Sequence, residues 1–255
     1  MFDKKDIDGA RKLYKEFRKE LNKQSLKKEE KYEILTQLAQ RTTIEGMFKE
    51  AIKIWGKAYL LAPSAIEKIK ILSEMTFCYT QLDKYFLAIL CNWKILWLSK
   101  YHKMKEYYLK ALYGFGEIYS FKGNFTKAIF FYKKILNLLS LEKEWEKEIY
   151  QKTLVSLFVC YHKQKKYSEA IQIFNLTQKL KLDEHLLMNL YLFRGHMHYD
   201  KHEYLDAKNW YQKALEVWKT LVPPTEKLKQ MHETDRINIE RWITECEEKL
   251  SKNFQ

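Results

Sequence analysis

The sequence predicts an all-α protein built as an array of five helical hairpins, and three observations lead to this prediction. The 255 residues include only three prolines and seven glycines, too few for the many turns of a β-sandwich or β-barrel. Alanine recurs in similar segments at near-constant intervals. Each such segment follows a stretch with its packing residues at i, i+3, i+4 and i+7, the period of one helix face. The five anchor alanines are Ala51, Ala88, Ala128, Ala170 and Ala207.

The N-terminal residues 1–31 are predicted to form an amphipathic capping helix, within the stretch DIDGARKLYKEFRKELNKQ. The extreme N-terminus has no apolar core segment and no cleavage-like site, so a secretory signal is not expected.

The third hairpin shows the packing pattern in the stretch GNFTKAIFFYKKIL. Gly123 can take the positive φ that ends one helix in a tight turn. Phe125 and Tyr132 then fall on one face of the next helix, and Ala128 lies between them. Because alanine is small, the backbone of a neighbouring helix can approach closely at that point. We therefore expect this segment to be a packing element with no catalytic role.

The other hairpins repeat this pattern with one departure. The position of Tyr132 carries an aromatic residue in three further copies, whereas the second copy has Asn92 there. Ser64 and Asp183 are placed to cap the helices that follow them. Residues 222–255 are predicted to form a C-terminal capping helix that covers the last apolar face of an array spanning residues 32–221.

This alternation of large and small residues resembles the tetratricopeptide repeat, and the resemblance covers residues 32–221 in five consecutive copies. It implies a right-handed α-α superhelix with a concave groove. The anchor alanines lie 37, 40, 42 and 37 residues apart, as the differences between their numbers show. These intervals exceed the usual 34 residues, which implies helices longer by about one turn. The sequence is therefore similar to the long-helix variants in bacterial peptide-sensing regulators and in motor light chains.

The sequence contains no signature of an enzyme or of a cofactor site. Glycine-rich phosphate loops and nucleophile elbows are absent. His198 and His202 are four residues apart and could share a metal, but the repeat alignment assigns His198 to the core and His202 to a turn. Four widely spaced cysteines indicate neither a zinc ribbon nor a disulfide framework. We expect no catalysis, no metal and no cofactor.

The resemblance implies that a protein or peptide segment binds in the concave groove, with the chain acting as a regulator or a scaffold. In this family the first helices of successive repeats line the groove, and their faces not used in packing project into it. A carboxylate clamp of the co-chaperone type is not expected, because only Lys110 fits among the matching positions. The predicted groove residues are Gln40, Phe77, Lys110, Tyr113, Glu117, Lys152, Val159, His162, Asn189, Phe193 and His196.

Two alternatives stay open. The net charge of +13 allows a nucleic-acid-associated protein with lysine-rich faces, although only six of the 46 basic residues are arginine. Exposed tryptophans at positions 93, 97 and 145 would allow self-association. A membrane span is not expected, because the longest apolar run, residues 85–98, is short and is interrupted by Asn92 and Lys94. The absence of a disulfide framework favours a reducing, cytoplasmic compartment.

Overall fold

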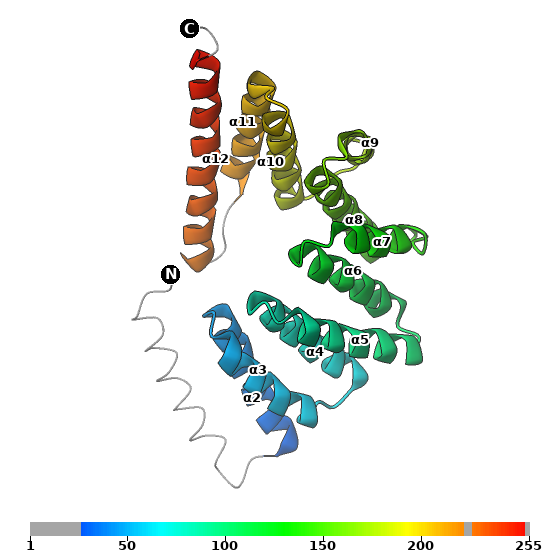
Figure 1. The fold of residues 1–255 in the computed structure, drawn as a ribbon. Coiled ribbons are helices and arrows are strands. Elements are labelled where there is room, and N and C mark those ends of the chain that lie inside the picture. The colour runs from blue at the N-terminus through cyan, green and yellow to red at the C-terminus, as the bar shows by residue number, and fades with distance from the viewer. Residues whose placement is uncertain (1–26, 222–225, 253–255) are drawn as a thin grey trace. The chain divides into compact units, whose positions relative to one another are not determined.

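The protein is all-α, as the sequence predicted (Figure 1). The computed structural model describes residues 27–221 and 232–252, and at residues 226–231 it describes the backbone alone. Over these residues it contains eleven helices and no strand, and neighbouring helices of the same compact unit pack as hairpins. They fall into two compact units, Met1–Asn124 and Phe125–Gln255. The predicted N-terminal capping helix falls almost wholly on residues 1–26, which lie outside the described residues.

The first unit is a row of helices in which each packs on the next. α4 also touches α6, so the first helices of two successive hairpins come together. Buried aliphatic side chains and the indole of Trp55 fill the space between the helices. The helices are α2 (Lys28–Ile44), α3 (Phe48–Leu61), α4 (Ala65–Gln81), α5 (Tyr85–Tyr101) and α6 (Lys105–Phe121).

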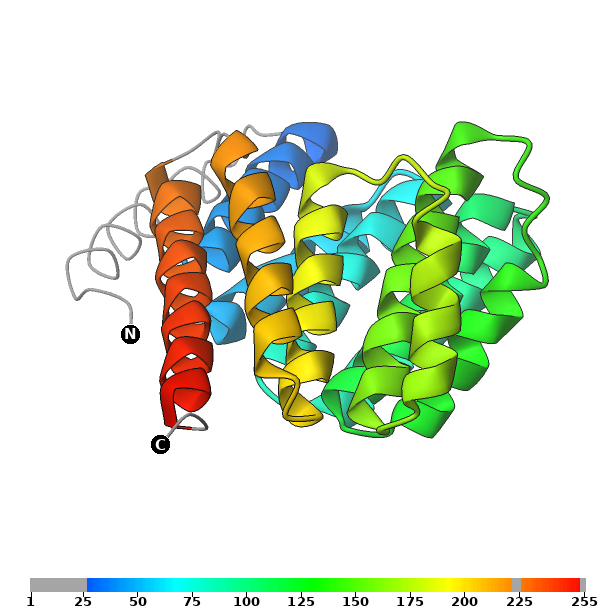
Figure 2. The ribbon, with the colours of Figure 1, turned by 90° about the horizontal axis from the view of Figure 1, so that it is seen from above.

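The second unit is also built of helices that pack on one another, and their lengths vary from 11 residues in α9 to 27 in α12. α8 contacts both α9 and α10, and Figure 2 shows α10, α11 and α12 standing side by side in that order. The helices are α7 (Phe125–Leu136), α8 (Glu144–Lys163), α9 (Tyr167–Thr177), α10 (Glu184–Asp200), α11 (Tyr204–Thr220) and α12 (Glu226–Lys252).

The anchor alanines lie where the sequence pattern placed them. All five are 0% exposed. Tyr132 is buried beside its anchor as well. The longest interval, between Ala128 and Ala170, contains the 20-residue helix α8. A connection at residues 137–143 adds to this interval, so a longer helix explains only part of it.

One turn geometry recurs between the helices. Gly123 has φ of 76°, as predicted, and the amide of Asn124 donates to the carbonyl of Tyr119 at 2.8 Å. The same bond, reaching five residues back, follows α2, α4, α5, α8 and α10. This is the Schellman arrangement, which satisfies carbonyl groups at a helix end. Non-glycine residues such as Lys165, with φ of 59°, adopt the left-handed conformation at a cost in conformational free energy.

Side-chain caps begin two helices as the sequence indicated. Ser64 accepts a hydrogen bond from the amide of Glu67 at 3.2 Å, at the start of α4. Asp183 accepts one from the amide of Leu186 at 2.9 Å, at the start of α10. Each oxygen satisfies an amide that the helix leaves unpaired.

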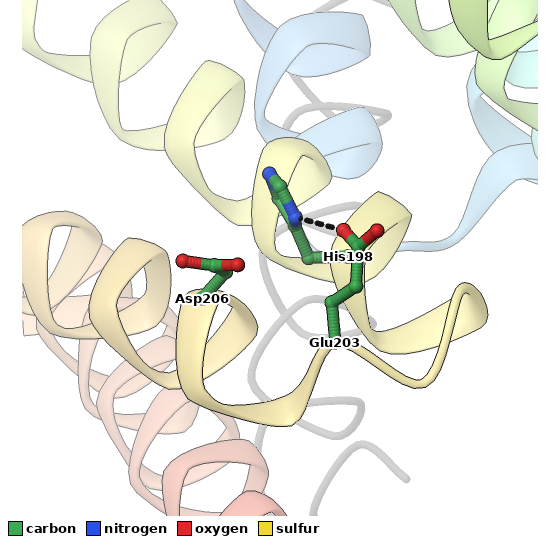
Figure 3. A group of neighbouring side chains, drawn as sticks. All are labelled: His198, Glu203 and Asp206. Atoms are coloured by element: carbon green, nitrogen blue, oxygen red, sulfur yellow. Dashed lines mark hydrogen bonds and ion pairs between the residues drawn. The ribbon is translucent and has the colours of Figure 1, made fainter.

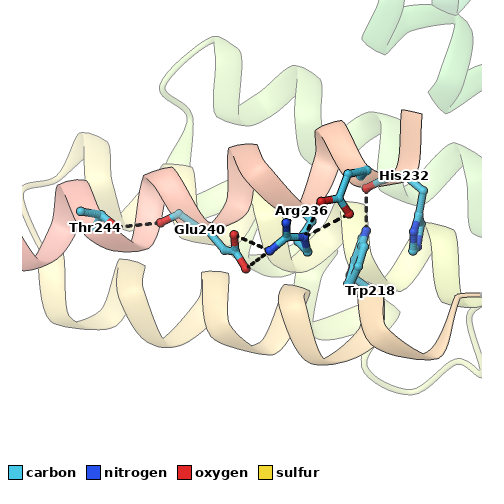
Figure 4. A network of polar contacts seen from close by, with 6 residues as sticks. Trp218, His232, Arg236, Glu240 and Thr244 are labelled. Carbon is cyan, nitrogen blue, oxygen red and sulfur yellow. Dashed lines mark hydrogen bonds and ion pairs between the residues drawn. The ribbon is translucent and has the colours of Figure 1, made fainter. Parts of the chain in front are cut away.

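α12 is attached to α11 by both polar and apolar contacts. The indole Nε1 of Trp218 donates to the carbonyl of His232 at 2.8 Å, and their rings stack with centroids 4.2 Å apart. Figure 4 also shows Arg236, which pairs with Glu233 and Glu240 along α12. Further along, Ile239 and Cys246 are buried against α11. The division of the chain into an array and two caps stays a prediction.

Of the described helices, α5 is the most apolar, and its run of apolar residues is interrupted by a buried Asn92 and an exposed Lys94. Within the part of the chain that the structure describes, no helix has both the length and the apolar character needed to cross a bilayer.

Candidate functional site

A cleft opens in the first unit between α4 and α6, the first helices of two successive hairpins. Its volume is about 500 Å³. α4 contributes Ser73 and Phe77 to one wall, and α6 contributes Lys110 and Phe121 to the other. Phe77 and Phe121 are both well exposed. The cleft therefore offers apolar side chains beside polar ones, as a site for a peptide requires.

The floor of the cleft is formed where the repeat pattern is broken. Asn92, on α5, occupies the position of the aromatic residue in other copies, and its amide Nδ2 donates to the carbonyl of Ala111 at 2.7 Å. Gly114 stands above it, and a Cβ at Gly114 would lie 2.8 Å from Asn92 Oδ1. The missing side chain at Gly114 makes room for Asn92. Asn92 is in turn smaller than the aromatic residue of the other copies, and the cleft lies above it.

The charged groups of the cleft differ in how they are paired. Lys70 pairs with Glu67 at 2.9 Å, and Lys110 pairs with Glu106 at 2.6 Å. Glu74 is half-buried in the cleft and has no hydrogen bond or ion pair with any described residue. Burial raises the pKa of its carboxyl above the ordinary value, because the charged form is poorly hydrated there. Glu74 is thus an acid suited to a basic group from a ligand.

Three of the predicted groove residues in the first unit lie together in this cleft, namely Phe77, Lys110 and Glu117. Tyr113 is partly buried on α6 and Gln40 is exposed on α2, and neither lines the cleft. The prediction omitted residues that α4 and α5 supply, including Ser73 and Ile95. The signal that could have located the cleft was Asn92 in place of an aromatic residue.

The six predicted groove residues of the second unit lie on two helices. Three of them lie close together. The ring centroid of Phe193 is 6.4 Å from that of His162 and 5.9 Å from that of His196. The structure places Lys152, Val159 and His162 on α8, and Asn189, Phe193 and His196 on α10.

The histidines of this group are engaged inside the unit. His162 is only 3% exposed, and its Nε2 donates to Asp200 at 3.0 Å. His196 shares a hydrogen bond of 2.7 Å with the hydroxyl of Tyr211, and Trp242 of α12 packs edge-on against its ring. Burial lowers the pKa of His196 to about 4, so it is neutral at pH 7. These contacts hold helices together, and the binding role of this group stays a prediction.

One group of side chains among the described residues could offer ligands to a metal ion. His198, Glu203 and Asp206 have ligand atoms within 4.8 Å of one another at the connection between α10 and α11 (Figure 3). Nδ1 of His198 already donates to Glu203 at 2.6 Å. His202 instead shares a hydrogen bond with the hydroxyl of Tyr204. Because His198 and His202 have different partners, the pair considered from sequence is not brought together.

Comparison with known proteins identifies the repeat. A family model described as tetratricopeptide repeat matches residues 109–138, which comprise most of α6 and all of α7. No curated protein sequence matches this chain. Domains of this kind are typically non-catalytic and generally bind proteins or peptides. The sequence-based prediction of tetratricopeptide repeats is thereby confirmed.

Several solved structures have a similar fold. The apo form of the quorum sensor NprR from B. thuringiensis is 15% identical with a TM-score of 0.68, over 91% of this chain and 62% of that one. The apo form of RapI is 14% identical with a TM-score of 0.56, over 89% of this chain and 66% of that one. Both are longer, so this chain spans about two thirds of their length.

A putative kinesin light chain from Podosopora anserina, with nearly identical TPR-like repeats, is 13% identical with a TM-score of 0.53. The match covers 72% of this chain and 92% of that one. At these identities the similarity concerns the fold alone.

Proposed function

We propose that this chain, which folds as a tetratricopeptide repeat protein, is a non-enzymatic module that binds a peptide or protein segment in the cleft between α4 and α6. The module acts as a regulator or a scaffold. The observation that supports the proposal is the unpaired Glu74 in an open cleft that the exposed rings of Phe77 and Phe121 also line.

The chemistry of the cleft defines the segment that it suits. Phe77 and Phe121 favour an apolar or aromatic side chain. Glu74 favours a lysine or arginine. Its half-buried carboxylate is poorly hydrated, and an ion pair with a cation compensates for that loss of hydration. Lys70 and Lys110 compete little for Glu74, since each already has an acidic partner. We therefore propose a segment that combines an apolar residue with a basic one.

Selection from a random-peptide library, followed by affinity measurement on purified chain, tests this proposal. We expect the selected peptides to combine an apolar residue with lysine or arginine. Their affinity should fall tenfold or more in Glu74→Lys and in Phe77→Ala, which corresponds to about 1.4 kcal/mol or more.

Matched controls separate the cleft from general effects of charge and exposure. Glu50→Lys makes the same charge change at an exposed position of α3, and Phe130→Ala removes an exposed phenylalanine from α7. Both should bind the selected peptides as the unaltered chain does. Peptides that bind Glu74→Lys and Phe77→Ala at full affinity would rule out the cleft as the binding site.

A further inference from the structure

A second surface of the first unit has its own exposed apolar stripe. It runs along α5 at spacings of three and four residues, which places its members on one helix face. All of them are between 43% and 71% exposed. The stripe consists of Phe86, Leu90, Trp93, Trp97 and Tyr101. Such a contiguous patch of large apolar side chains is typical of an interaction site.

The stripe borders a groove between α3 and α5, with a volume of about 590 Å³. Leu72, Met75 and Tyr79 of α4 form its floor. They lie on a different face of α4 from Ser73 and Phe77, so this groove is separate from the α4–α6 cleft.

A missing side chain keeps the groove open. Gly56 lies inside α3, and apart from the backbone of α3 and the two adjacent residues, no described atom lies within 4 Å of the position that its Cβ would take. At the corresponding position the other four copies carry a larger residue. These residues are Trp93, Lys133, Asn175 and Gln212. The space beside Gly56 is therefore free to receive a side chain from another molecule.

The charge around the groove has one sign. None of its lining residues is acidic, and Lys94 lies within it. Lys53 and Lys57, on the exposed face of α3 that also carries Gly56, flank it. None of the three lysines makes an ion pair with a described residue. The groove thus combines an apolar floor with unpaired positive charge at its edges.

We propose that the α3–α5 groove binds an amphipathic helix of a partner protein, with its apolar face in the groove and acidic residues along its flanks. The stripe from Phe86 to Tyr101 is about 22 Å long at 1.5 Å per residue, which suits a partner helix of about four turns. Acidic flanks complement Lys53, Lys57 and Lys94.

Two other occupants fit the surface less well. A second copy of this chain also carries a net charge of +13, so the two copies repel each other. An anionic membrane would meet the tryptophans and lysines, but a bilayer surface leaves the recess beside Gly56 unfilled, whereas an apolar side chain of a helix enters it.

The test is selection from a displayed library of amphipathic helices, in which the apolar face varies and each flanking position is either glutamate or lysine. We expect enrichment of helices with glutamate flanks that bind the purified chain. Gly56→Leu fills the recess and should weaken binding tenfold or more, while Gly56→Ala, which adds only a methyl group, retains most of it. Both substitutions favour helix α3, so the fold should be preserved.

A second set of variants keeps the test independent of Gly56. Trp97→Ser removes part of the stripe and should weaken the selected helices tenfold or more. Exchange of Lys53, Lys57 and Lys94 for glutamate should reverse the preference from glutamate to lysine flanks. Glu74→Lys, in the other cleft, should leave helix binding unchanged, so that the two proposals fail separately.

Four results would overturn the inference. These are the absence of any enriched helix, enrichment of lysine flanks, full affinity of the selected helices for Gly56→Leu, and unchanged binding to Trp97→Ser. Light scattering and co-sedimentation with vesicles of phosphatidylcholine and phosphatidylserine complete the experiment. Dimerisation or vesicle binding that Gly56→Leu abolishes would assign the groove to a second copy or to a membrane instead.

Discussion

Two glycines inside helices should respond to the same substitution in opposite directions. At Gly195, in α10, a Cβ would lie 2.5 Å from Cε1 and 2.6 Å from Cδ1 of Tyr211. Carbon atoms in contact are normally about 3.5–4.0 Å apart, so the overlap is about 1 Å. At Gly56, in α3, the same Cβ meets nothing within 4 Å.

The magnitude follows from what Tyr211 can do. Its ring is 1% exposed, its hydroxyl is hydrogen-bonded to His196, and Trp242 packs beside it. Movement away from the new methyl group would disturb these contacts, at a cost of about 1–3 kcal/mol. Alanine is favoured over glycine in a helix by about 1 kcal/mol. Gly195→Ala should therefore destabilise the protein by up to about 2 kcal/mol, while Gly56→Ala should stabilise it by about 1 kcal/mol.

Hydrogen exchange measured by mass spectrometry, as denaturant is raised, gives α3 and α10 separate readouts within the full chain. Gly195→Ala should lower the protection of α10, and Gly56→Ala should raise that of α3. In a Tyr211→Ala background, Gly195→Ala should lose its destabilising effect, which gives a coupling of about 1 kcal/mol or more. Unchanged or increased protection of α10 in Gly195→Ala would refute the reasoning.

Three further predictions concern titration and backbone strain. Burial raises the pKa of Glu74, so its ionised form opposes folding above that pKa and ceases to do so as pH falls. Glu74→Gln should therefore raise Tm at pH 7, with a gain of no more than about 1 kcal/mol in the free energy of unfolding. At pH 3 the substitution should have little effect. His196 has a pKa of about 4 in the folded chain against an ordinary 6.5. The unfolded chain thus gains a proton first as pH falls between these values, and up to about 3 kcal/mol of stability should be lost there. His196→Gln should show a smaller loss in denaturant titrations at pH 7 and pH 4.5, and an identical loss would contradict the burial of this imidazole. Lys165→Gly removes the strain of a positive φ and should raise the free energy of unfolding by about 0.5 kcal/mol. Lys163→Gly, at the last residue of α8, should show no such gain.

The fold could be predicted from the sequence because the interactions that determine it are local. A helix face repeats every three to four residues, and a turn needs one residue with a positive φ, so Gly123 and Ala128 could be interpreted from their neighbours alone. The aromatic residue four positions after four of the five anchors then identified the repeat. The confirmed caps at Ser64 and Asp183 depend on an interaction only three residues long.

The candidate sites are different, because each depends on side chains from three helices. Phe77 and Lys110 line opposite walls of a cleft whose floor contains Asn92, which comes from a third helix and is smaller than the aromatic residue of the other copies. The helix period places His162 and His196 on the face predicted to line the groove. In the structure, however, His162 is hydrogen-bonded to Asp200, and His196 contacts Tyr211 and Trp242 within the same unit. Helix periodicity specifies which way a side chain points and leaves open what stands opposite.

The sequence by itself determined the helices, their turns and the small residues at which they pack, since these features arise from interactions within one hairpin or between adjacent ones. The tertiary structure decided where space is left over. Open volume beside Gly56, the cleft above Asn92 and an unpaired carboxylate at Glu74 are defined by atoms that are absent from the surroundings. Such an absence becomes apparent only when every neighbouring side chain has been placed.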